Sequence, residues 1–158
     1  MTKHSLIQIR LATSADLPRL AALLHAAFIE YKSSYTDEGF AATTPTAEQL
    51  AKRMTEGPIW VAEENGMLHG TVSAVSRGED LYIRGMAVLP ESRGLGVGQL
   101  LLATVERFAQ SHKRLTLSTT PFLINAIRLY ERSGFRRTTD GPHDLFGTPL
   151  FTMVKKLD

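Results

Sequence analysis

The chain has 158 residues, of which 43% are hydrophobic and 22% charged, a composition typical of one soluble globular domain with its own core. Its formal net charge is only +2 and no basic stripe or block stands out, so nucleic-acid binding is not indicated. The absence of cysteine excludes disulfides, thiolate metal ligands and a cysteine nucleophile, and the five histidines lack metal-binding spacing, so we expect no metal site.

The N-terminal segment MTKHSLIQIRLA alternates apolar and polar residues through Ile7, Ile9 and Leu11, which predicts a first strand. It lacks the long apolar centre of a signal peptide. Elsewhere no apolar run approaches the ~20 residues that a membrane helix needs. Together with the absence of cysteine, these features favour a cytoplasmic protein that does not interact with a membrane.

Two helices are predicted next. Ser14 is expected to cap the first, which carries a leucine-rich face. Residues 29–45 are polar and aromatic without a clear period, so we expect an irregular or weakly helical loop. Thr46 and Gln49 form a capping box that opens a short helix over about 47–54.

The rest of the chain alternates strands and helices. Two apolar runs flank Asn65-Gly66, a pair that tolerates the positive φ of a type I′ turn, and predict a hairpin. Strands are expected at DLYIRGMAVLP, LTLST and LFTMVKKL, and helices after ESRGLG and over PFLINAIRLYERSGF, where Gly134 suits the C-cap and Phe135 starts a strand. The order β α α β β β α β α β β predicts a single α/β (α+β) domain over residues 1–158 with a mixed sheet.

The segment ESRGLGVGQLLLATVERFA places glycines at alternate positions where a helix begins. The first amides of a helix lack intrahelical partners, the helix dipole is positive there, and Arg93 adds a full charge, so an anion could bind. A tight strand-to-helix turn without a ligand is equally compatible with the segment. The dinucleotide fingerprint fails because Gln99 and Leu101 stand where its third glycine would be, and no P-loop Gly-Lys-Ser/Thr follows.

A second motif lies in NAIRLYERSGF, where Asn125, Tyr130, Gly134 and Phe135 show the spacing N-x-x-x-x-Y-x-x-x-G-F. With R-x-x-G-x-G after the strand end VLP, this region (81–135) resembles the GNAT superfamily of acyl-CoA-dependent N-acetyltransferases. The resemblance implies a GNAT-like, mostly antiparallel central sheet of about seven strands flanked by about four helices. It also implies transfer of an acetyl group from acetyl-CoA, a cosubstrate, to a primary amine by direct attack in a ternary complex.

The resemblance further assigns cofactor-binding positions. The pyrophosphate of acetyl-CoA would lie on the amides around the R-x-x-G-x-G motif, and the pantetheine arm would pair with the strand before it like an added strand. Gly85 inside that strand predicts a bulge, which would free backbone groups for this pairing. The expected cofactor-binding residues are Met86, Ala87, Val88, Arg93, Gly94, Leu95, Gly96, Val97, Gly98, Asn125 and Tyr130.

For the chemistry, the resemblance makes Tyr130 the acid that assists departure of the thiolate. Because a tyrosine pKa of about 10 exceeds a thiol pKa of about 8.5, we expect Tyr130 to act largely as a hydrogen-bond donor. Many relatives carry a glutamate as general base where this chain has Tyr82. We therefore expect a water relay, with Glu79, Asp80 or Tyr82 as weaker candidates for the base.

The acceptor site is expected between the loop 30–40, with Tyr31, Tyr35 and Phe40, and the tail loop around His143. The acceptor is a small-molecule or peptide amine whose identity the sequence leaves open, as it does the use of acyl groups other than acetyl. The sequence leaves the oligomeric state open, and the resemblance adds a homodimer as one candidate because relatives are often dimers. The alternatives are a non-catalytic acyl-CoA sensor and a nucleotide- or phosphate-binding regulatory domain.

Overall fold

The computed structural model describes residues 6–139 and 143–158, so parts of the N-terminal segment and of the tail loop before His143 lie outside the described residues. The α-helices are α1 (Leu17–Phe28), α2 (Asp37–Thr43), α3 (Ala47–Met54), α4 (Val97–Phe108) and α5 (Ile124–Arg132). The 3-10 helices are η2 (Ser14–Asp16), η3 (Ile29–Ser34) and η4 (Pro90–Ser92). The strands are β1 (Gln8–Leu11), β2 (Ile59–Glu64), β3 (Met67–Arg77), β4 (Asp80–Val88), β5 (Arg114–Thr119), β6 (Arg136–Arg137), β7 (His143–Leu145) and β8 (Thr148–Lys156). In these ranges no helix has the length and apolar character needed to cross a bilayer.

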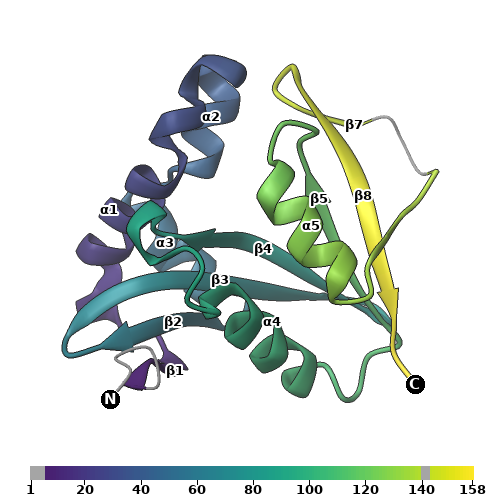
Figure 1. Ribbon diagram of the computed structural model, residues 1–158, viewed down its shortest axis with the longest axis horizontal. Helices are drawn as coiled ribbons and strands as arrows, with labels where there is room; N and C mark the ends of the chain where they lie inside the picture. The colour runs from purple at the N-terminus through teal and green to yellow at the C-terminus, as the bar shows by residue number, and fades with distance from the viewer. Residues whose placement is uncertain (1–5, 140–142) are drawn as a thin grey trace.

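The strands form one sheet in the order β1-β2-β3-β4-β5-β8-β6, and β7 pairs with β8 (Figure 1). All of these pairs are antiparallel except β4 with β5. The predicted mixed, mostly antiparallel sheet is therefore confirmed. Its one parallel pair, β4 with β5, lies inside the sheet; in the sequence the R-x-x-G-x-G motif lies between these two strands and the second motif follows β5.

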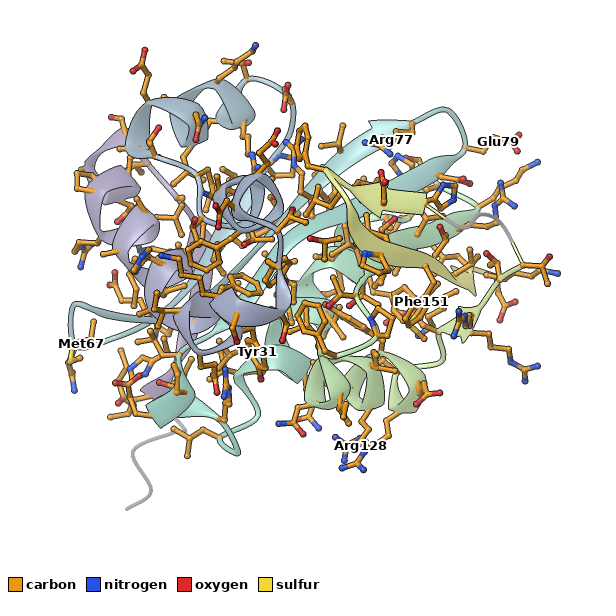
Figure 2. The ribbon with its side chains drawn as sticks, turned by 90° about the horizontal axis from the view of Figure 1, so that it is seen from above. Tyr31, Met67, Arg77, Glu79, Arg128 and Phe151 are labelled. Atoms are coloured by element: carbon orange, nitrogen blue, oxygen red, sulfur yellow. The ribbon has the colours of Figure 1, made fainter. Side chains whose placement is uncertain are left out.

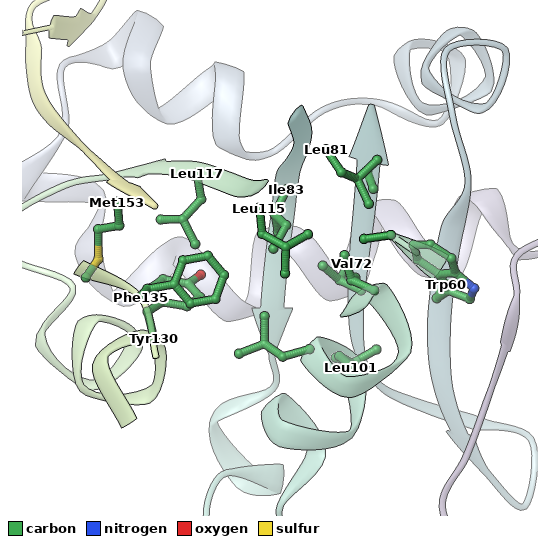
Figure 3. Packing of buried hydrophobic residues seen from close by; sticks show 14 of the residues in the cluster. Trp60, Val72, Leu81, Ile83, Leu101, Leu115, Leu117, Tyr130, Phe135 and Met153 are labelled. Atoms are coloured by element: carbon green, nitrogen blue, oxygen red, sulfur yellow. The ribbon is translucent and has the colours of Figure 1, made fainter. Parts of the chain in front are cut away.

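Helices cover both faces of the sheet. On one face α4 and α5 enclose the larger core, which contains Leu81 and Ile83 of β4, Leu101 of α4 and Tyr130 of α5 (Figure 3). On the other face α1 packs through a second core that includes Leu20 and its neighbouring leucines. Leu81 and Ile83 of β4 face α4. Because side chains alternate along a strand, Tyr82 and Arg84 face the other way.

Several local predictions are confirmed. Thr46 and Gln49 cap α3 reciprocally. Asn65 and Gly66 have φ angles of 52° and 78° in the β2–β3 turn. The prediction of a Ser14 cap is wrong, because Ser14 lies inside η2 and the Thr13 N–H donates to the Asp16 carboxylate instead, at 2.8 Å.

The segment predicted as an irregular or weakly helical loop contains η3 and α2. Thr36 caps α2 by accepting from the Gly39 N–H at 3.0 Å, and its own N–H donates to the Thr148 hydroxyl at 2.9 Å. Thr148 lies 112 residues further along the chain. A helix of only seven residues that is held by so distant a partner leaves no local periodicity to detect.

The pairing of β4 changes at Gly85. Thr71 pairs with Ala87 but Ser73 pairs with Arg84, so two residues of β4 stand opposite the single residue between Thr71 and Ser73. Gly85 has a φ of 66°, which confirms the predicted bulge. On its other side β4 pairs with β5 only over residues 80–83, so in the described structure the β4 edge from Arg84 onward has no strand partner.

Candidate active site

A cavity of about 570 Å³ lies where β4 parts from β5. Its walls come from β4, from the turn that leads into α4, from α5, and from the end of α1 with η3. It brings together all of the predicted cofactor-binding residues except Leu95, which is 39% exposed outside the lining. The residues brought together are Met86, Ala87, Val88, Arg93, Gly94, Gly96, Val97, Gly98, Asn125 and Tyr130.

The N-terminus of α4 opens into this cavity. Gly96 is the N-cap residue with a φ of 78°, a conformation that few side chains tolerate, and it offers no side chain to cap the helix. The first helical bond runs from the Leu100 N–H to the Gly96 carbonyl, so the amides before it have no helical partner. Gly98 lets α4 approach α5, because a Cβ there would lie 2.6 Å from Leu129 Cδ2. Gly96 therefore leaves main-chain donors at the start of α4 without a cap, and Gly98 allows α4 and α5 to pack closely beside them.

The cavity lining is electropositive. Arg93, Arg128 and Arg132 contribute to it, and no aspartate or glutamate does so among the described lining residues. Arg93 is not unpaired, because its Nη2 lies 2.7 Å from Glu30 Oε1 at the start of η3. That ion pair is partly exposed on both sides, so it is weak enough for another anion to displace Glu30.

Tyr130 closes the inner end of the cavity. Its ring packs edge-on against Phe135 with centroids 5.8 Å apart, and the residue is only 6% exposed (Figure 3). Burial raises the pKa of Tyr130, and the neighbouring Tyr35 and Tyr82 raise it further. Its side chain makes no hydrogen bond to a described residue, so a protonated donor lines the cavity without an internal acceptor.

The candidate bases lie elsewhere. Glu79 is 68% exposed and pairs with Lys113, and Figure 2 shows it at the β3–β4 turn, far from Tyr31. Asp80 accepts two hydrogen bonds from Arg114, at 2.8 and 3.1 Å. Asp80 and Tyr82 line a second cavity of about 370 Å³ on the opposite face of the strands, with His143.

The aromatic residues expected in the acceptor site divide between two places. Tyr31 lines the large cavity, beside Phe122. Tyr35 and Phe40 are each 7% exposed, and the Tyr35 ring packs perpendicular to Phe122 at 4.9 Å. Burial raises the pKa of Tyr35 to about 12, in keeping with a packing role. His143 is in the second cavity and not in the first.

Other lining residues were not predicted. Gln99 and Arg128 lie in helices one turn or less from predicted positions, so helical periodicity could have added them. Ala27 and Phe28 end α1, and in the sequence they read as part of an ordinary apolar face. Only the tertiary fold brings α1 to the cavity.

Comparisons with known proteins identify this arrangement. The profile of the Acetyltransferase (GNAT) family matches residues 20–135. The chain is 29% identical over 135 residues to an uncharacterised N-acetyltransferase, YjgM, of Escherichia coli (strain K12), covering 80% of each protein. It is 33% identical to N-acetylaspartate synthetase of Danio rerio, over 66% of this chain but only 38% of that protein. It matches only 40% of the probable N-acetyltransferase family 8 member 5 of Mus musculus, so it spans about two fifths of these two longer relatives.

Solved structures agree in fold. The PaiA N-acetyltransferase of Thermoplasma acidophilum, in complex with coenzyme A, superposes with a TM-score of 0.81 over 96% of this chain and 99% of its own, at 18% identity. A GNAT-family acetyltransferase of Staphylococcus aureus Mu50 gives a TM-score of 0.80 at 19% identity, with the same coverage of both chains. With the family profile spanning well over half of the sequence, the chain belongs to the GNAT family of acetyltransferases.

Proposed function

We propose that this chain transfers the acetyl group of acetyl-CoA to a primary amine by direct attack, with both substrates bound at once. The observation that carries the proposal is the large cavity, which joins the open amides of α4 to the unpaired edge of β4 and to the Tyr130 hydroxyl. The names of the relatives, which are N-acetyltransferases and an N-acetylaspartate synthetase, support acetyl transfer to an amine.

The cavity fits the cofactor at both ends. A diphosphate needs hydrogen-bond donors and positive charge, which the first amides of α4 and Arg93 supply once Arg93 exchanges Glu30 for the ligand. The pantetheine amides need partners along an extended strand, which the open edge of Met86–Val88 supplies. The bound cosubstrate brings the activated thioester, and the chain's own groups orient it.

Tyr130 is the proposed donor to the charge that develops on sulfur. Its raised pKa keeps the hydroxyl protonated throughout the neutral range. Because the described residues of the cavity lining include no carboxylate, we expect the amine's proton to leave through water or to be lost before attack. For an amine of pKa about 10.4, freeing the lone pair at pH 7 costs about 4.6 kcal/mol. We therefore expect kcat/KM to rise with pH between about 7 and 9, in proportion to the free-amine fraction.

The test is an amine panel offered with acetyl-CoA, with thiol release as the readout. We expect turnover of at least one class of amine and acetylated product by mass spectrometry. A protein that binds acetyl-CoA and turns over no amine would contradict the proposal and support the non-catalytic sensor. The one observation that favours that second function is that no carboxylate lines the cavity among the residues that the structure describes.

Two further features belong to the proposal, a cytoplasmic location and a homodimer. Cell fractionation and light scattering on the purified protein test them separately from the catalytic assay.

A further inference from the structure

We propose that the acceptor is an amine with a carboxylate close to its amino group, as in a free amino acid, and that Arg53 and Arg84 bind that carboxylate. The inference rests on the proposed acetyl transfer and names its second substrate. The two arginines lie on α3 and β4, outside both sequence motifs.

The first observation is position. Arg84 directly precedes the bulge, and Arg53 Nη1 lies 3.9 Å from the place where a Cβ on Gly85 would stand. The open edge of β4 begins here, so the reactive end of a thioester paired along Met86–Val88 is expected nearby. Arg84 belongs to the face of β4 that points away from α4, where Glu56 and α3 meet it. The two guanidinium groups therefore lie beside the expected position of the thioester, on the face of β4 away from α4, and neither arginine is among the residues that line the large cavity.

The second observation is a shortage of negative charge. Arg84 Nη2 pairs with Glu56 Oε1 at 2.7 Å, while Arg84 Nε is buried without any acceptor. Arg53 donates to the Ala42 carbonyl at 3.2 Å, and no carboxylate of the described residues lies within ion-pair distance of it. Glu56 is 40% exposed, and the further neighbour Lys52 is another cation. Two half-buried guanidinium groups thus share one carboxylate at the surface.

This arrangement is costly in the free protein. Burial lowers the pKa of Arg53 and the charge of Arg84 lowers it further, which means that the site disfavours the second positive charge. Buried charges and donors without partners destabilise a fold, and they are retained where a ligand completes them. A carboxylate accepts in the fork geometry that guanidinium groups offer, and it would satisfy both residues.

The spacing selects the ligand class. An amine that attacks beside Gly85 while its carboxylate meets Arg53 must carry the two groups only a few atoms apart. A free amino acid does so, whereas a peptide N-terminus has an amide in place of that carboxylate. The same cations would also lower the pKa of the acceptor's ammonium group, which helps a site without a carboxylate base.

The test compares free amino acids with their amides, which share the amine and side chain but lack the carboxylate. In the wild type we expect kcat/KM, calculated from the concentration of unprotonated amine because the ammonium group of the amide is the more acidic, to be at least about 10-fold higher for the acids. Arg53→Gln and Arg84→Gln should each lower kcat/KM for the acids by about 10- to 100-fold and leave the amides unchanged. Lys52→Gln is the control: it removes a positive charge from the same helix as Arg53 and should change kcat/KM neither for the acids nor for the amides. Unaltered affinity for acetyl-CoA shows that the variants are folded.

The outcomes separate the two proposals. Equal turnover of acids and amides, or a loss in Lys52→Gln matching that in Arg53→Gln, overturns the carboxylate site and leaves acetyl transfer standing. If acetyl-CoA binds and other amines without a carboxylate are acetylated, but neither the amino acids nor their amides are, then the carboxylate site alone is wrong. If no amine of any class is acetylated, both proposals fall.

Discussion

At the scale of single residues, the candidate site depends on a few polar groups that have no internal partner. Tyr130 is the clearest case, since the residue is largely buried, lines the cavity and makes no side-chain hydrogen bond to a described residue. We predict that Tyr130→Phe lowers kcat by about 100-fold, as expected for loss of a positioned acid or donor. Affinity for acetyl-CoA and the melting temperature should stay nearly constant, because no internal hydrogen bond is lost. Unchanged turnover, measured by thiol release, would remove Tyr130 from the mechanism.

The ion pair between Arg93 and Glu30 gives a second prediction at this scale. Arg93→Gln should weaken CoA binding by about 10-fold, because it removes a charge-assisted contact to the diphosphate. Glu30→Gln frees the same arginine and should leave affinity equal or slightly higher. Both variants break an exposed pair worth about 0–1 kcal/mol, so stability should hardly distinguish them. Equal losses of affinity in calorimetric titrations would show that the pair itself, and not the charge of Arg93, supports binding.

At the scale of secondary-structure elements, the bulge in the β3–β4 pairing lies directly after the point where β4 stops pairing with β5. Gly85→Ala should destabilise the fold by about 1–2 kcal/mol, because the positive φ disfavours a side chain. The new Cβ would meet Ser73 Oγ at 3.6 Å and Arg53 Nη1 at 3.9 Å, which are ordinary contacts. Gly78→Ala is the matched control, since its φ is 62° and nothing lies within 4 Å. We expect similar stability losses by urea denaturation but reduced acetyl transfer only for Gly85→Ala.

The start of α1 is a second element with a defined energetic source. Asp16 is 2% exposed and its carboxylate accepts from Arg10, Arg19 and the Thr13 N–H. The hydrogen bond from Arg10 and that of Thr13 hold the pKa of Asp16 well below its usual range, with the charge of Arg10 adding to the effect. Because the pKa of Asp16 is lower in the folded state, its ionised carboxylate stabilises the fold at pH values above the ordinary aspartate pKa. This stabilisation is lost progressively as the pH falls below that value.

Asp16→Asn should therefore lower the free energy of unfolding by about 2 kcal/mol at pH 7. The difference from the wild type should shrink below about pH 4, where the unfolded wild type takes up a proton. Urea denaturation at pH 7 and pH 3 measures it, with exposed Glu48→Gln as the control. A difference that is the same at both pH values would contradict this account.

At the scale of the whole molecule, the sequence predicted features set by local chemistry. The capping box at Thr46, the turn at Asn65-Gly66 and the bulge at Gly85 each follow from one residue type in one conformation, and each is confirmed. The helix α2 was missed because its cap depends on Thr148, far along the chain. The proposed pairing of Arg53 with Arg84 could not be predicted, because a charged residue on a helix or at an alternate strand position is typical of a solvent-facing side chain. Only the packing of α3 on the sheet brings them together.

The central claim is that the amides at the start of α4 and the open edge of β4 bind acetyl-CoA. Titration of ¹⁵N-labelled protein with CoA, followed by amide chemical shifts, tests it most directly. We predict that the largest shifts fall in residues 93–98 and 86–88, with smaller ones in α5 near Asn125. Shifts confined to the second cavity around Tyr82, or saturable binding that leaves residues 93–98 unmoved, would contradict the account.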